Sequence, residues 1–288
     1  TYSWGVPVIT GGITGAAAST NQTTINGTLV NPTNDVQTAT YTIIPKSGSC
    51  IGSSFTAVIT VNPSSKVVFS GINQTVCSGS DSSPISIISP TTGTVTFNWT
   101  ANGPAGISGA TPSGTNTIPT QTLVNLTTNP LTVTYTAAAT FENDGVSCSG
   151  PTLDYKIIVN PAIITSSILS NFNGFNVSSD GATDGTINVT VTGGSGAYTY
   201  LWSGPGVFSA TSQDISNVAA GAYTLTINDG LCNAVILNFT LTSPLPLLIQ
   251  EDTSAHIDVL CFGYLTGTIK VAITQQSVGP YDYVLTLQ

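Results

Sequence analysis

Residues that could do chemistry are few and widely spaced in this sequence. No Cys-x-x-Cys pair occurs among the cysteines, and there is a single histidine, His256. Zinc sites are usually built from four Cys or His ligands at short spacings. We therefore predict no zinc site. The cysteines are Cys50, Cys77, Cys148, Cys232 and Cys261.

Calcium is the one metal for which the sequence offers ligands. In the stretch SDGATDG, residues 179–185, Asp180 and Asp184 are each followed by a glycine. Calcium prefers several oxygen ligands from loops of this kind. Asp-Gly pairs are also ordinary turn formers. The turn is the preferred interpretation, with no resident cofactor, and a calcium site at the two aspartates is the alternative.

Catalytic arrangements are equally poorly supported. A Ser-His-Asp triad would require His256, which lies in a part of the chain that does not complete a repeat. A carboxylate pair for glycoside hydrolysis needs two acids in one cleft, whereas most acids here lie at predicted turns. We predict that the chain is not an enzyme.

Composition narrows the class of protein further. The 288 residues carry 13 acids against 4 lysines, for a net charge of −9. Phosphate binding needs clustered basic residues, so nucleic acid is not an expected partner. No apolar run of about 18 residues exists, so we expect no membrane insertion. The chain begins with Thr1 rather than methionine, and we expect it to be a mature or excised piece of a longer protein.

The elements that must position these residues are β-strands. Polar and apolar residues alternate in segments bounded by turn clusters such as ENDG and GGSG, and no segment has a capped helical stripe. This pattern predicts an all-β protein. The alternating segments include residues 96–100, 131–137, 186–192, 222–228 and 268–274.

The strands recur at long intervals, which indicates tandem repeats. An aromatic-x-Trp strand appears at Trp4, Trp99 and Trp202, and Val-Asn-Pro ends a strand at Pro63 and again at Pro161. Repeats as long as the interval from Pro63 to Pro161, with a tryptophan on a central strand, are typical of immunoglobulin-like β-sandwiches. We expect a linear array of such sandwiches, with the tryptophans in their cores rather than on a sugar-stacking surface.

The motifs VCSG (76–79), FNWT, TYT, SCSG and VNP resemble PKD-like repeats of large surface proteins of Bacteroidota. The motifs TVTGGSGAYTYLWSGPG and ISNVAAGAYTLTINDGLC resemble the SprB repeat of gliding-motility adhesins. The resemblance assigns residues 1–63 to the C-terminal part of a PKD-like repeat and 64–161 to a complete one. Residues 162–246 form a SprB-type repeat, and 247–288 begin a further, truncated one.

The resemblance also implies a disulfide framework and a location. A secreted, extracellular protein attached to the outer-membrane surface after type IX secretion would be expected to form disulfides. Cys77 and Cys148 would then pair within the complete repeat. Cys50, Cys232 and Cys261 would be unpaired within this chain. The partners of Cys50 and Cys261 would lie outside it, and Ser179 stands where a partner of Cys232 is expected. Five buried thiols are the alternative.

Three functions are consistent with the sequence. The first is a stiff spacer in a surface filament, whose partners are the neighbouring repeats. The second is a module that binds polysaccharide through loops at the sandwich ends, above all the long loop predicted for residues 102–119, which contains no aromatic residue. The third is docking to an outer-membrane motility or secretion component. The candidate contact for such docking is the apolar segment LPLLIQ (245–250).

Overall fold

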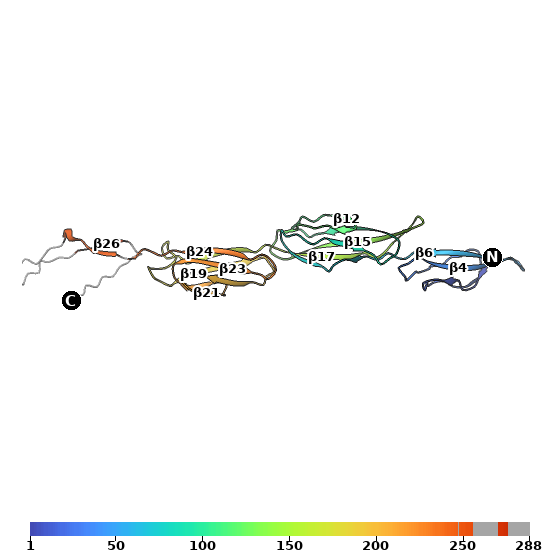
Figure 1. Cartoon of the computed structure of the whole chain (residues 1–288), viewed down its shortest axis with the longest axis horizontal. Helices are drawn as coiled ribbons and strands as arrows, with labels where there is room; N and C mark the ends of the chain where they lie inside the picture. Colours follow the sequence, from blue (N-terminus) through green and yellow to red (C-terminus); the bar gives the residue numbers. More distant parts are fainter. Residues whose placement is uncertain (247, 256–269, 276–288) are drawn as a thin grey trace, which may run out of the picture. The chain divides into compact units, whose positions relative to one another are not determined.

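The computed structural model of the chain describes residues 1–246, 248–255 and 270–275 (Figure 1). The chain divides into two compact units, Thr1–Pro161 and Ala162–Gln288. We refer to residues 1–63 as the first repeat, 64–161 as the second and 162–246 as the third. Strands dominate throughout the described residues, which contain one short 3-10 helix, so the predicted all-β class is confirmed.

The first repeat consists of one sheet arranged around a long strand, β4. Strands β1 and β2 pair with one edge of β4, β5 and β6 with the other, and β3 pairs with β1. Alternation along β4 places Ala39, Tyr41 and Ile43 in the core, against Trp4 and Ile13. The strands are β1 (Tyr2–Trp4), β2 (Val8–Ile9), β3 (Ser19–Gln22), β4 (Gln37–Ser47), β5 (Cys50–Ile51) and β6 (Phe55–Val61).

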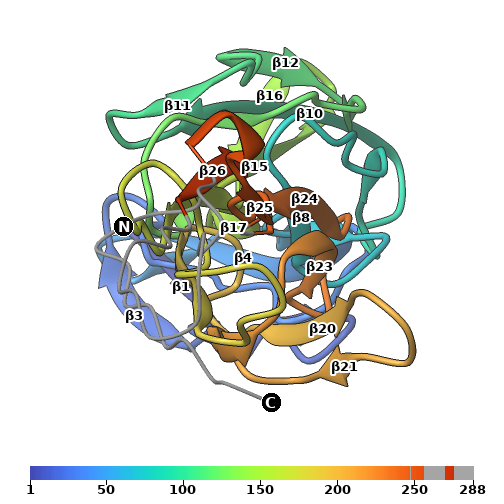
Figure 2. The ribbon, with the colours of Figure 1, turned by 90° about the vertical axis from the view of Figure 1, so that its left-hand side faces the viewer.

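The second repeat is a two-sheet sandwich. One sheet has the order β12-β10-β15-β17-β8, with β16 also on β15, and the other has the order β13-β9-β7, beside a small β11-β14 pair. Figure 2 shows β10 and β12 together, as their pairing requires. The strands are β7 (Val68–Phe69), β8 (Gln74–Cys77), β9 (Ile85–Ile88), β10 (Thr94–Asn102), β11 (Ile107–Ser108), β12 (Ser113–Thr115), β13 (Thr117–Ile118), β14 (Val124–Asn125), β15 (Leu131–Asn143), β16 (Val146–Ser149) and β17 (Leu153–Asn160).

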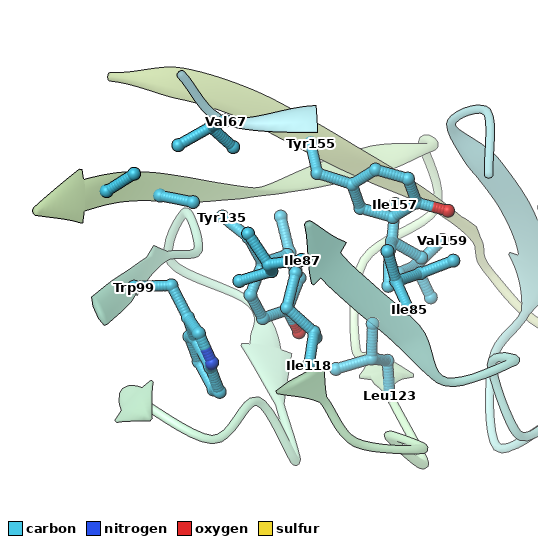
Figure 3. Packing of buried hydrophobic residues seen from close by; sticks show 13 residues of the cluster. Val67, Ile85, Ile87, Trp99, Ile118, Leu123, Tyr135, Tyr155, Ile157 and Val159 are labelled. Atoms are coloured by element: carbon cyan, nitrogen blue, oxygen red, sulfur yellow. The ribbon is translucent and has the colours of Figure 1, made fainter. Parts of the chain in front are cut away.

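The core of the second repeat lies between these sheets. Trp99 and Tyr135 meet edge to face, with ring centroids 5.6 Å apart, in the arrangement that aromatic pairs prefer. Figure 3 shows both rings beside Ile87 and Ile118 of the opposite sheet. Burial raises the pKa of Tyr135 to about 12. The strict alternation of β15, with its odd-numbered residues from Val133 to Phe141 buried, therefore supplies the centre of the sandwich.

The third repeat is also built from two sheets, β18-β19-β22 and β21-β20-β23-β24. Its core contains Trp202, Ile187, Leu225 and Ile227, all fully buried. Further along the chain, β25 pairs antiparallel with β26, and the 3-10 helix η1 follows β25. The bounds are β18 (Ile164–Leu169), β19 (Gly185–Thr192), β20 (Thr199–Ser203), β21 (Ser209–Ala210), β22 (Ile215–Val218), β23 (Gly221–Asn228), β24 (Val235–Leu241), β25 (Leu248–Glu251), η1 (Thr253–Ala255) and β26 (Val271–Gln275).

The prediction that residues 102–119 form one long loop is wrong. Strands β11, β12 and β13 all lie within it, and Ile118 is buried. The segment was predicted as a loop because its glycines, prolines and short polar residues suggested turns, and because two- and three-residue strands have no detectable alternation. Pairing with β14, β10 and β9 orders these short strands.

Candidate functional site at the junction of two repeats

The linker that joins the first repeat to the second is built into the second repeat. Pro63 is buried, and Ser65 has no exposed surface. The Ser65 hydroxyl donates toward the carbonyl oxygens of Ala139 at 2.5 Å and Cys148 at 3.2 Å. Buried hydroxyls need such partners because an unsatisfied polar group is costly to bury. The linker is thus an internal element of the sandwich.

Gly150 makes this close approach possible. A Cβ atom at this position would lie 1.5 Å from the carbonyl oxygen of Ser65, which is far inside van der Waals contact. The Gly150 N–H donates to the carbonyl of Ala139, as the Gly52 N–H donates to the carbonyl of Pro45 in the first repeat. Glycine is therefore required at residue 150 by the linker that lies across it.

The β15–β16 hairpin extends toward the same linker. In the first repeat, Cys50 faces Ser47 next to the turn. In the second, Cys148 faces Phe141, and the hairpin continues through two more pairs to Asn143 opposite Val146. At its tip, Asn143 Nδ2 donates to Asn62 Oδ1 at 3.0 Å. The extra length of this hairpin therefore provides a contact with the end of the first repeat.

A second set of contacts joins the loop after Asn31 to the loop before β10. The Thr92 N–H donates to the carbonyl of Asn34 at 3.0 Å, and the Thr92 hydroxyl lies 2.5 Å from Asp35 Oδ1. Two side-chain oxygens of these loops, Asn34 Oδ1 and Thr91 Oγ1, are buried and have no hydrogen-bond partner among the described residues. The junction thus has two separate groups of polar contacts, one through the linker and one through these loops.

Two asparagines that the sequence analysis did not single out organise the loops of these repeats. Asn125 Nδ2 donates to the carbonyls of Asn129 and Val159, both at 2.8 Å, and its Oδ1 accepts from the backbone and hydroxyl of Thr127. Asn31 makes the same bonds to Asp35, Val61 and Thr33. The Asn-x-Thr triplet that begins at Asn31 recurs at Asn125, and the same interval separates Tyr41 from Tyr135. This recurrence is the sequence signal from which the two asparagines could have been found.

The cysteines do not follow the predicted pairing. Cys148 is a free thiol, so it is not the partner of Cys77, which does take part in a disulfide. Cys232 is also disulfide-bonded, so the prediction that it is unpaired is wrong as well. Cys50 is a free, exposed thiol. The predicted Cys77–Cys148 pair is wrong because the two residues have different neighbours in the sheet. Cys148 lies opposite Phe141 in a hairpin, whereas Cys77 lies opposite Asn160.

The tryptophans are buried, as predicted. Trp4, Trp99 and Trp202 have exposed fractions of 6%, 2% and 0%. Each indole N–H donates to a backbone carbonyl, those of Ala17, Thr117 and Ser212 respectively. This settles their role as core residues, because a buried indole cannot form a stacking surface for a ligand.

The two predicted calcium candidates occupy a turn. Asp180 is exposed, and Asp184 Oδ1 accepts the N–H of Ser178 at 3.1 Å. Hydrogen bonds from Ser178 lower the pKa of Asp184. Within the described residues no group of three or more His, Cys, Asp or Glu side chains comes together. His256 and Cys261 lie outside the described residues.

A different aspartate, Asp229, is the most heavily used carboxylate of the third repeat. It accepts N–H groups of Ser195 at 2.8 Å, Leu231 at 3.0 Å and Cys232 at 2.7 Å. Burial opposes its ionisation, but these amides outweigh that effect and lower the pKa of Asp229. The Asp-x-x-Cys spacing in NDGLC was visible in the sequence, and its function is to hold two loops together.

The architecture and these contacts define a class, a tandem array of immunoglobulin-like β-repeats. The family model of the PKD-like domain matches residues 1–65 and 74–163, more than half of the chain, and the model of the SprB repeat matches residues 180–207. The chain belongs to the PKD-like domain family, with a SprB repeat in its third repeat. This is the organisation of a cell-surface, adhesin-type repeat region.

Solved structures with a similar fold are distant. They include a C-terminal fragment of intimin in complex with the intimin-binding domain of its translocated receptor, at 13% identity, 67% of both chains and a TM-score of 0.35. Extracellular domains 3–5 of Drosophila OTK match at 12% identity, 72% of this chain, 71% of that chain and a TM-score of 0.36. Similarity at this level does not bear on function. No curated protein matches the chain.

The described residues contain no helix of the length and apolar character required to cross a bilayer. The apolar segment LPLLIQ contributes Leu248–Gln250 to β25, and Leu245, Leu248 and Ile249 are exposed. Strand β25 pairs antiparallel with β26.

Proposed function

We propose that the chain is a segment of a large secreted surface adhesin, in which its repeats act as a stiff spacer that holds adhesive regions away from the cell. The partners implied by this role are neighbouring repeats, with surface polysaccharide and outer-membrane components of a motility or secretion machinery at the ends of the filament. Attachment and gliding are the processes that such a filament would serve. No catalytic step is part of this proposal.

The observation that carries the proposal is the burial of the linker at the first junction. A flexible tether would be exposed and free of specific bonds. Here Ser65 is fully buried and bonded to two carbonyls, and Asn143 reaches back to Asn62. Bending at this point would break these bonds and expose buried polar groups, which opposes flexibility.

Spin-label distance measurements test the stiffness of this junction. Labels at Thr20→Cys and Thr100→Cys, in a background with Cys50, Cys148 and Cys261 changed to serine, report the distance between the first two repeats. We expect a narrow distribution that broadens in Ser65→Ala/Asn143→Ala. The matched control is Ser64→Ala, because Ser64 is the exposed neighbour of Ser65. A distribution that is equally broad in all three proteins would contradict the spacer function.

A further inference from the structure

The second repeat bonds a strand near the point where the chain enters it to the strand on which the chain leaves it. Strand β8 comes early in this repeat, β17 is its last strand, and the two pair in parallel. The pairing covers four residues of each strand, from Gln74 opposite Ile157 to Cys77 opposite Asn160. The entry and exit segments of the repeat are therefore joined directly to each other.

Further hydrogen bonds extend this ladder at both of its ends. Before β8, the Ile72 carbonyl accepts the Tyr155 hydroxyl at 2.6 Å, and Asn73 Oδ1 accepts the Lys156 N–H at 2.9 Å. After β8, the Ser78 N–H donates to the carbonyl of the last residue of β17 at 2.8 Å. We refer to residues 72–78 and 155–160, with the bonds between them, as the β8–β17 clamp.

The direction of the two strands decides how the clamp responds to tension. A pull on the chain before the repeat draws β8 backward along its own axis, and a pull on the chain after the repeat draws β17 forward along its axis. Because the strands are parallel, these movements are opposite, and the ladder is loaded in shear. Its hydrogen bonds run across the direction of the pull and must break together.

The contacts that tension reaches before the clamp are less extensive. Strand β7 pairs with β9 through two residues, and the linker is held by the Ser65 hydroxyl. Behind the clamp, Ile157 and Val159 of β17 have no exposed surface, so the core face of this strand is closed to water. The clamp is therefore the main connection that tension has to break in the second repeat.

The third repeat is connected differently. Its first strand, β18, and its last strand, β24, lie in different sheets, and within the described residues no ladder joins the two. Segments near its two ends meet at Thr242, whose carbonyl accepts the N–H groups of Asn176 and Val177. Tension therefore has to pass from one sheet to the other through side-chain packing, which is non-directional and lets the sheets slide.

We propose that the second repeat bears tension along the chain through the β8–β17 clamp, and that the third repeat yields at lower force. Tension is a different load from the bending that the buried linker opposes. This role rests on the filament function proposed above, because a chain comes under tension only when it is held at both ends.

Single-molecule force spectroscopy on the full chain, held by a tag at each terminus in reducing buffer, tests this role. Reduction ensures that no disulfide shares the load. The repeats differ in their number of residues, so the length released in each step identifies the repeat that has unfolded. At the same constant force, the second repeat should unfold at least about tenfold more slowly than the third, because several more hydrogen bonds must break together. Equal or faster unfolding of the second repeat overturns the proposal.

Two variants separate the clamp from general stability. Asn73→Ala/Tyr155→Phe removes two side-chain bonds of the clamp and should speed the unfolding of the second repeat under force. Gln121→Ala is the matched control, because the buried Gln121 side chain bonds to Thr111 and Pro119, which lie outside the clamp. It should lower the urea midpoint of this repeat but leave its unfolding rate under force unchanged. Equal effects of the two variants on that rate contradict the role of the clamp.

A second direction of pulling tests the geometry of the clamp, and it decides if the double variant fails to fold. Handles at Thr94→Cys and Glu142→Cys, in a chain whose five native cysteines are changed to serine, hold two residues that lie opposite each other near one end of the β10–β15 ladder. Force applied there opens an antiparallel ladder one pair at a time. The second repeat should then unfold at a much lower force than in the same serine variant pulled through its termini.

Equal unfolding forces in the two directions would show that the orientation of the clamp carries no load and would overturn the proposal. None of these outcomes changes the spin-label distances expected for a stiff junction. Failure of the clamp and failure of the spacer function are therefore distinguishable.

Discussion

At the scale of single residues, the polar side chains with assigned contacts serve mainly to satisfy the backbone. Asn31 and Asn125 replace missing strand partners in two loops, Ser65 satisfies two carbonyls, and Asp229 accepts three amides. Short polar side chains are well suited to this task because they reach backbone groups a few residues away. The abundance of Asn, Ser and Thr in the sequence therefore has a structural explanation here.

The Asp229 carboxylate should make the third repeat sensitive to acid. Its folded-state pKa lies below the ordinary value, so its contribution to stability is present above that ordinary value and is lost as pH falls through the folded pKa. Asp229→Ala leaves three N–H groups without an acceptor and should cost about 3 kcal/mol in the free energy of unfolding at neutral pH. Hydrogen exchange of peptides from β23, in the core of the third repeat, at increasing urea concentration measures this cost.

The control for this prediction is Asp180→Ala, since Asp180 is exposed. It should leave the urea midpoint unchanged. If Asp229→Ala unfolds at the same urea concentration as the parent at neutral pH, the carboxylate does not hold the two loops together.

Residue-level prediction from the sequence succeeded for the tryptophans and for the free thiol of Cys50, and failed for the Cys77–Cys148 pair and for Cys232. Burial of Trp99 follows from its place in an alternating strand, which is local information. Whether Cys77 meets Cys148 depends on which ends of β8 and β16 lie near each other, and the sequence contains no local sign of that. The proposed calcium role of Asp180 and Asp184 stays a prediction.

At the scale of elements, the β15–β16 hairpin and the linker depend on each other. Gly150→Ala should place its methyl group against the Ser65 carbonyl and displace the linker, because the two atoms would be 1.5 Å apart. We expect a loss of roughly 3 kcal/mol in the stability of the second repeat, in the range of severe overpacking. Proteolysis under native conditions should then cut near residues 62–66, which are protected in the parent.

Gly103→Ala provides the matched control, because a Cβ there would meet Ile107 and Val133 at 3.7 Å, which is ordinary contact. Its protease pattern should equal that of the parent. Unchanged protection of the linker in Gly150→Ala would show that the close approach is not needed for the junction.

Long elements were predictable from the sequence and short ones were not. Strands β10, β15 and β23 have enough alternation to be recognised, and they were. Strands β11, β12 and β13 have two or three residues each. At that length the residue pattern is the same in a loop and in a strand, and only the neighbouring strand decides which one forms.

At the scale of the whole molecule, each repeat has its own hydrophobic core, and these cores are unequal. The core of the first repeat, Trp4, Ile13, Ala39, Tyr41 and Ile43, is packed on a single sheet, whereas the second repeat packs a larger set between two sheets. Burial of apolar area is the main source of stability. The first repeat should therefore be the less stable of the two.

Hydrogen exchange in increasing urea tests this order. Peptides from β4 should lose protection at a lower urea concentration than peptides from β15, which lie at the centre of the second core. Identical midpoints for both strands would show that the junction joins the two repeats into one cooperative unit and would contradict the predicted order.

The sequence by itself determined the all-β class, the tandem repetition, the burial of the tryptophans and the family, because each of these is written in local alternation or in motifs that recur along the chain. Only the tertiary structure decided the state of the cysteines and the burial of Ser65 against Gly150. These features depend on contacts between segments far apart in sequence, such as Ser65 with Ala139 and Cys148. Such contacts form only when the sheets assemble, and no local pattern encodes them.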